Sequence, residues 1–237
     1  ELLKDERFIN SVKVTLIYVV TSVPTKLIFA LFVAYLLTQG RRGVTFYRSL
    51  YYVPSLIGGS IAVALVWKTI FSRKGLANTI LASLGLQKLS WLGDPKLSMG
   101  ILVLMSAWQF GSSMIIFAAG LKEIPGSYYE AAEIDGANKW QRFLSITLPC
   151  LSPIILYNLV MQTITAFMAF TQAFVITQGG PNDATNFYAL YVYNHAFKWS
   201  NMGYASAMSW LMLVLISVIT LILFKSSKFW VFSEADQ

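Results

Sequence analysis

The stretch that decides the fold is "EAAEIDGANKWQRFLSITLP", residues 130–149. It is the most polar part of a chain of 237 residues that is 56% hydrophobic and 12% charged, about half the charge of an ordinary soluble domain. Apolar runs lie on both sides of it, each long enough for the about 20 helical residues that cross a bilayer. The polar stretch is therefore a loop between two membrane spans.

Apolar runs of membrane length recur along the chain and predict an all-α, polytopic membrane protein. A large soluble helical core is disfavoured because its helices would show a charged face, and these do not. Basic residues are shared almost evenly between the two sides of the membrane, so the positive-inside rule does not fix the orientation. The predicted spans cover about 11–37, 48–71, 97–121, 151–177 and 203–224.

The loop itself carries helix signals. Ser127 precedes a glutamate by three residues, the spacing of a capping box, and this predicts a helix over 128–135. Gly136 follows at the position of a left-handed C-cap. A second helix is predicted over 139–147, with a stop at Pro149. A helix of about two turns is marginal in water on its own, so it must pack on the membrane surface of its own chain or on another protein.

Two predicted spans carry residues that are unusual inside a membrane. Lys26 lies near the middle of the first span, where it either faces protein or water, or snorkels or pairs locally. The sequence leaves both readings open. In the second span, Pro54, Gly58 and Gly59 predict a kink and a close contact with another helix.

Several kinds of chemistry have no matching motif. The sequence has no glycine-rich phosphate-binding loop ending in Lys-Ser or Lys-Thr, and no H-E-x-x-H zinc motif. The predicted spans hold no Asp or Glu, which disfavours a proton or sodium relay. Cys150 and His195 are the single residues of their kinds, so neither a disulfide scaffold nor a metal cluster is expected.

The pattern E-A-A-x-x-D-G-A, followed by I-x-L-P, resembles the "EAA" loop in the membrane subunits of binding-protein-dependent ABC importers. The stretch from Thr177 to Ala207 resembles the carbohydrate-uptake branch, of the maltose and glycerol-phosphate permease kind. The resemblance covers about residues 10–224 and departs at Thr171 and Gln172, where relatives often have an acidic residue. The matching residues are Glu130, Ala131, Ala132, Asp135, Gly136, Ala137, Phe143, Ile146, Leu148, Pro149 and Pro153.

The resemblance implies an ABC importer type I permease bundle of about five membrane helices in a bacterial or archaeal cytoplasmic (inner) membrane. The loop 122–150 is then cytoplasmic, as is the tail 226–237, while residues 1–10 and the loops 72–96 and 178–202 are external. The implied coupling residues, which face an ATPase, are Glu130, Ala131, Ala132, Asp135, Gly136 and Ala137.

The resemblance also implies partners. They are a second homologous permease subunit, two ATP-binding subunits that hold ATP and Mg, an extracytoplasmic substrate-binding protein and the lipid membrane; nucleic acid is not among them. The chain itself is expected to be non-catalytic and to hold no cofactor or metal. It would form half of the pore for a sugar or oligosaccharide. The alternatives are a permease for glycerol phosphate or another polyol, and a stand-alone secondary transporter or channel.

Polar side chains in the third and fourth spans suit a sugar path, because amides and hydroxyls both donate and accept hydrogen bonds. Contacts between helices would explain the same residues. The residues are Trp108, Gln109 and Ser112 in the third span and Asn158, Gln162, Thr165 and Gln172, expected on one helix face, in the fourth.

The outer loop 178–202 is predicted to contact the binding protein. Gly179, Gly180 and Pro181 form a turn. Tyr188 and Tyr191 follow as part of a tyrosine cluster, which forms either a membrane-interface belt or a docking surface.

Overall fold

The structure, a computed structural model, describes residues 2–38 and 43–232. Within these ranges the regular elements are all helical, as predicted. The predicted external segment 1–10 is therefore described from Leu2, and the predicted tail 226–237 as far as Phe232. The rest of these two segments, and residues 39–42, lie outside the described residues.

Three helices in the described ranges are long and apolar enough to cross a membrane. They are α1 (Glu6–Thr38), the continuous helix Lys139–Phe167 and α11 (Met202–Ser227). Two further spans are bent pairs of helices. The α2 (Val44–Ile57) and α3 (Ile61–Ile70) axes meet at 98°. Those of α5 (Pro95–Trp108) and α6 (Gly111–Glu123) meet at 44°.

The bend between α2 and α3 confirms the predicted kink. Gly58 ends α2 with its N–H donating to the Pro54 carbonyl, and the Ser60 side chain caps α3 by accepting from the Val63 N–H. A Cβ at Gly58 would collide with the Gln109 side chain, so the predicted close contact is also present there. Gly59 has no such neighbour within 4 Å.

The fourth span differs from its prediction at both ends. The helix predicted over 139–147 does not stop at Pro149. Instead, α8 (Lys139–Arg142) continues through the π-turn η2 (Phe143–Thr147) into α9 (Leu148–Phe167). A π-turn already leaves a carbonyl without its helical donor, so a proline two residues after its end removes little hydrogen bonding. At the other end, α9 stops at Phe167 rather than Thr177, and a second π-turn, η3 (Ala173–Thr177), follows after a break.

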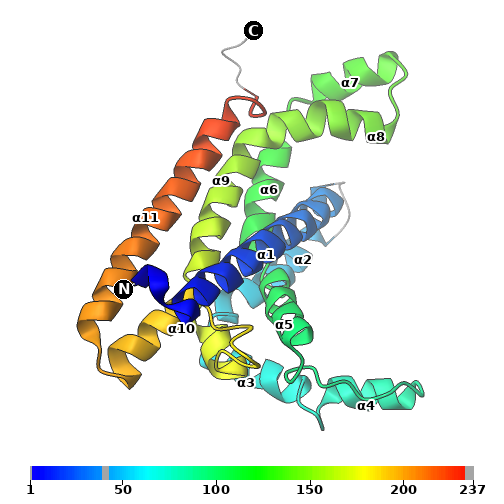
Figure 1. Cartoon of the computed structure of the whole chain (residues 1–237). Coiled ribbons are helices and arrows are strands. Elements are labelled where there is room, and N and C mark those ends of the chain that lie inside the picture. Colours follow the sequence, from blue (N-terminus) through cyan, green and yellow to red (C-terminus); the bar gives the residue numbers. More distant parts are fainter. Residues whose placement is uncertain (1, 39–42, 233–237) are drawn as a thin grey trace.

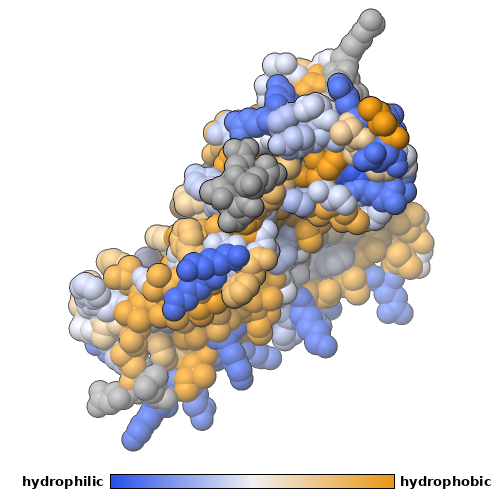
Figure 2. All heavy atoms as spheres, turned by 90° about the horizontal axis from the view of Figure 1, so that it is seen from above, coloured by the Kyte–Doolittle hydropathy of each residue, from blue (hydrophilic) through white to orange (hydrophobic). Residues whose placement is uncertain are grey.

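Helix α1 crosses the middle of the bundle and packs against α5, α6 and α9 (Figure 1). Small side chains, Ala30 and Ala34, are fully buried along it and allow close approach. The outermost helix, α11, exposes apolar side chains such as Trp210 and Leu221, as a lipid-facing helix does. Figure 2 shows hydrophobic residues over most of the visible face, with a group of hydrophilic ones at the upper right, on the side of α7 and α8, and others along the lower edge.

The two ends of the bundle carry different elements (Figure 1). At one end α7 (Gly126–Ile134) and α8 project near the C-terminal end of α11. At the other end lie α3, α4 (Leu76–Ser83) and α10 (Tyr188–Tyr193). Helix α4 lies in the loop 72–96. The two loops expected outside are therefore opposite the loop expected inside.

The close approach of α2 to α6 gives a stability prediction. A Cβ at Gly111 would lie 2.7 Å from the Tyr52 Cα and closer still to the Tyr51 carbonyl oxygen. Both are backbone atoms, so a change of side-chain rotamer cannot relieve the clash. We expect Gly111→Ala to destabilise the purified protein by about 1–3 kcal/mol, seen as a lower thermal midpoint. Gly100→Ala is the control, since Gly100 lies in α5 and a Cβ added there would have no heavy atom of another residue within 4 Å. Equal midpoints would contradict this packing.

Candidate functional site

The polar loop forms a pair of short helices, but not with the predicted cap. Helix α7 begins at Gly126, so Ser127 lies inside its first turn, and the N-cap is Pro125, which has no side-chain acceptor. The predicted capping box of Ser127 and Glu130 is therefore wrong. A capping box is present on α8 instead, where the Asn138 side chain accepts from the Trp140 and Gln141 N–H groups and Gln141 reaches back.

The joint between the helices has the predicted glycine geometry. Gly136 has φ +78°, which confirms the left-handed C-cap. Its N–H donates to the Glu133 carbonyl, and the Ala137 N–H donates to the Ala132 carbonyl at 2.9 Å. These are the two bonds of a Schellman motif. The turn between α7 and α8 is thus fixed by backbone bonds.

Two side-chain contacts attach α7 to the helix that continues into the bundle. The Tyr129 hydroxyl lies 2.9 Å from the hydroxyl of Thr147, which is buried. The Arg142 guanidinium donates to the Glu133 carboxylate, also at 2.9 Å. Because η2 and α9 form one helix with α8, a displacement of α7 would reach α9 through these contacts.

Much of the surface of this helix pair is exposed. No residue of α7 is buried. Ile134 and Trp140 are 87% and 66% exposed, which is unusual for large apolar side chains at the polar end of a membrane protein. Among the predicted coupling residues, four are exposed and two are partly buried: Glu130, Ala131, Asp135 and Gly136, and then Ala132 and Ala137.

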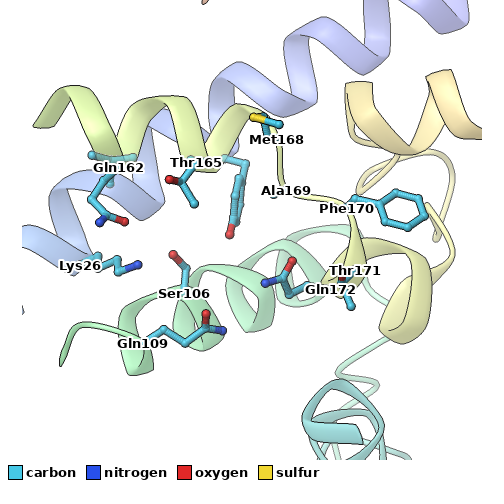
Figure 3. Close-up of a pocket in the computed structure, with 13 residues that line it drawn as sticks. Lys26, Ser106, Gln109, Gln162, Thr165, Met168, Ala169, Phe170, Thr171 and Gln172 are labelled. Carbon is cyan, nitrogen blue, oxygen red and sulfur yellow. The ribbon is translucent and has the colours of Figure 1, made fainter. Parts of the chain in front are cut away.

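A polar cavity of about 210 Å³ lies inside the bundle (Figure 3). Four of the predicted path residues line it: Gln109, Gln162, Thr165 and Gln172. Gln109 ends α5 and donates to the Gly58 carbonyl, and Gln162 projects from α9 on the other side. Gln172 reaches the cavity from the break after α9, not from the continuous helix face that the spacing predicted.

The other three predicted path residues lie elsewhere. Trp108 packs its ring 5.8 Å from that of Trp67, in an apolar setting. Ser112 uses its backbone N–H to donate to the Ser55 hydroxyl. Asn158 is buried and donates to the Ile154 carbonyl of its own helix. For Trp108 and Ser112, the contacts between helices that the sequence left open describe the structure better, whereas the Asn158 amide bonds within its own helix.

The cavity also contains residues that the polar stripe did not include. Lys26 is 8% exposed and lines it, which selects the reading that it faces the protein interior rather than snorkels. Ser106 and Thr171 complete its polar wall. A lysine inside a predicted span was the signal for Lys26. The sequence did not show that this lysine faces α5 and α9, so it could not be added to the predicted sugar path.

The outer loop forms the predicted turn but hides its tyrosines. Gly179 has φ +86° and is followed by Pro181 in a tight turn. Tyr188 and Tyr191 are only 2% and 3% exposed. Tyr188 donates to the Met208 carbonyl, and Tyr191 donates to Asp5. These two side chains hold α10 between α1 and α11, so the expectation that they form a docking surface is not met.

Asp5 joins the start of α1 to α10 and α11. One carboxylate oxygen accepts from the Arg7 and Phe8 N–H groups and so caps α1, and the other accepts from the Tyr191 and Tyr204 hydroxyls, each at 2.7 Å. Burial raises the pKa of Asp5, but the hydrogen bonds outweigh this effect and hold the pKa below its usual value. Burial, and then Asp5 itself, raises the pKa of Tyr191, so that hydroxyl stays protonated and donates.

This cluster predicts a pH dependence. Because the folded pKa is depressed, the stabilisation is present above the unfolded pKa of about 3.9 and is lost as the pH falls below it. We expect the thermal midpoint to decrease when the pH is lowered below about 4. At pH 7, Asp5→Ala should lower the free energy of unfolding by about 1 kcal/mol through the lost cap. Glu6→Ala, at an exposed neighbour, is the control. If the thermal midpoint of Asp5→Ala still decreased below pH 4 by as much as that of the original protein, this role would be contradicted.

A bundle of bent, membrane-length helices with an interior polar cavity and a helix pair displayed at one end defines a membrane transport protein. The family described as "binding-protein-dependent transport system inner membrane component" matches residues 4–229, and the chain belongs to this family. It is the permease component of such an ABC importer, a multi-pass protein of the inner membrane, as the sequence predicted.

Individual relatives agree with this assignment. The chain is 53% identical over 236 residues to the probable ABC transporter permease protein YesP of Bacillus subtilis (strain 168), covering 98% of this chain and 76% of that protein. It is 34% identical over 230 residues to the trehalose/maltose transport system permease protein MalF of Thermococcus litoralis, covering 96% and 77%. Its structure matches a bacterial ABC transporter involved in alginate import with a TM-score of 0.86, at 25% identity over 96% of this chain and 81% of that one.

Proposed function

We propose that this permease forms half of the pore of an ATP-driven importer for a sugar or oligosaccharide. A second homologous permease subunit would complete the pore, two cytoplasmic ATP-binding subunits would supply the energy with their ATP and Mg, and an extracytoplasmic binding protein would deliver the sugar. The chain itself is then non-catalytic and needs no cofactor. The names of its relatives, which include trehalose/maltose and lactose permeases, support the substrate class.

The observation that carries this proposal is the exposed helix pair. Helix α7 is braced by the Schellman turn, by Tyr129 and by Glu133, yet presents Glu130, Ala131 and Ile134 outward. A rigid short helix with an unpartnered face suits a groove on another protein. The brace runs into α9, which also carries Gln162 into the cavity. Motion of an ATPase would therefore be carried to the wall of the sugar path as a rigid-body movement.

Purification of the intact assembly tests this proposal against a stand-alone transporter or channel. A tagged chain isolated from its native membrane in mild detergent is expected to bring a second permease and an ATP-binding subunit. In vesicles, that complex should import sugar only with ATP and the binding protein. A chain that purifies alone and passes sugar without ATP would overturn the proposal.

A further inference from the structure

Lys26 is a positive charge in the membrane-spanning part of α1. Figure 3 shows its side chain ending between Gln162 of α9 and Ser106 of α5. None of the 13 residues that line the cavity is Asp or Glu. The two ion pairs found among the described residues, Arg7–Asp183 and Arg142–Glu133, do not involve it. A cation inside a membrane is costly and is retained where it meets an opposite charge or serves a transport path.

We propose that Lys26 binds the transported sugar and that this sugar carries one carboxylate, as an oligosaccharide with a single uronic acid residue does. The inference rests on the proposed function, because it takes the cavity to be the sugar path. The names of relatives leave the charge of the substrate open, since they include trehalose/maltose, which are neutral, and alginate, which is acidic.

The composition of the cavity wall favours an acidic sugar over a neutral one. Neutral hydroxyls need only dipolar partners, and Gln109, Gln162 and Ser106 supply these. A buried ammonium adds a desolvation cost that such hydroxyls offset poorly. A carboxylate entering the membrane interior carries its own desolvation cost, and pairing with Lys26 lowers both at once.

The single charge also distinguishes a carboxylate from a phosphate. Lys26 is the one charged residue among the 13 that line the cavity. It neutralises the one negative charge of a carboxylate. A phosphate monoester carries about −1.5 to −2 at neutral pH and would leave excess negative charge unpaired in a low-dielectric site. The Gln109 amide, whose nitrogen donates to Gly58, keeps its carbonyl for sugar hydroxyls.

Direct binding to the complete importer in lipid nanodiscs, without the binding protein, tests the proposal. The probes are three disaccharides that each join one uronate (glucuronate, galacturonate or mannuronate) to one neutral sugar, each paired with its carboxyl-reduced neutral counterpart, and glucose 1-phosphate. Saturation-transfer NMR titrations measure each affinity. We expect at least one acid to bind about tenfold more tightly than its neutral counterpart, Lys26→Gln to erase that difference, and Lys26→Arg to keep it.

Other outcomes overturn the proposal. Equal or better binding of every neutral counterpart, or loss of acid and neutral binding alike in Lys26→Gln, removes the carboxylate assignment. Tighter binding of glucose 1-phosphate replaces carboxylate with phosphate. Failure of Lys26→Gln to assemble with the second permease would mean that Lys26 pairs with that subunit.

The proposed function fails separately. If neutral sugars bind, and the chain still assembles with ATP-binding subunits, only the acidic substrate is lost. If no sugar of either kind binds and the chain purifies without an ATPase, the proposed function falls and this inference falls with it.

Discussion

Gly136→Val is expected to abolish sugar uptake while the complex still inserts and assembles. Gly136 has φ +78°, and a Cβ there would meet no heavy atom within 4 Å. The cost therefore comes from the backbone alone: a left-handed residue with a Cβ costs about 1–2 kcal/mol, and β-branching adds to it. The Schellman turn would open, and α7 would lose its fixed angle to α8. Uptake should fall at least about tenfold, the equivalent of 1.4 kcal/mol.

Two controls separate backbone strain from a general effect of substitution in the loop. Gly136→Asn should keep most of the uptake, because asparagine tolerates the left-handed region better than other residues. Gly126→Val places the same side chain at the start of α7, where φ is not positive and no heavy atom lies within 4 Å of the Cβ. Binding of the ATPase, ATP hydrolysis and uptake are measured in reconstituted vesicles. Normal uptake by Gly136→Val would remove the coupling assignment.

Glu130 gains a clearer role from the structure. As a capping residue it would have stabilised its own helix, but it is exposed and the capping box is at Asn138. Its carboxylate is thus free to face a partner, and Glu130→Gln should weaken ATPase binding without changing the thermal stability of the isolated chain. A lower thermal midpoint would return it to a structural role.

The helix pair could be predicted because its signals are local. A glycine at a helix end and an asparagine before the next helix determine the turn between them, and both acted as their residue types favour. The errors were also local. The sequence could not show that α7 begins at Gly126, nor that a π-turn before Pro149 would let the helix continue, because neither has a residue signature of its own.

The cavity was predicted only in part, because it depends on contacts between distant segments. The helix-face rule placed Gln162 and Thr165 correctly, since both lie on α9. Gln172 also lines the cavity, but it does not lie on the α9 face as predicted: α9 ends at Phe167, and Gln172 comes just before η3. Side-chain chemistry alone placed Trp108 and Gln109 in the same predicted path, yet the two adjacent residues line different cavities. In the same way, Tyr191 is buried because Asp5, 186 residues away, accepts its hydrogen bond.

Gln162→Leu is expected to lower sugar transport about tenfold or more while leaving assembly intact. The side chain projects from α9 into the cavity opposite Lys26 and Ser106 (Figure 3), and leucine keeps a similar size but neither donates nor accepts. A site built to hydrogen-bond a hydroxyl or carboxylate discriminates strongly when its own partner is removed. Uptake and binding-protein-stimulated ATP hydrolysis are measured in the same vesicles.

The neighbouring Met161→Leu is the matched control, because Met161 lies on the same helix with its side chain exposed on the outside of the chain. It should transport normally. If Gln162→Leu instead prevents assembly with the second permease, and the complexes that do form transport at the normal rate, the glutamine belongs to a contact between subunits and the cavity is not the sugar path. Reduced uptake with normal assembly in Gln162→Leu, set beside normal Met161→Leu, would place the path on the inner face of α9.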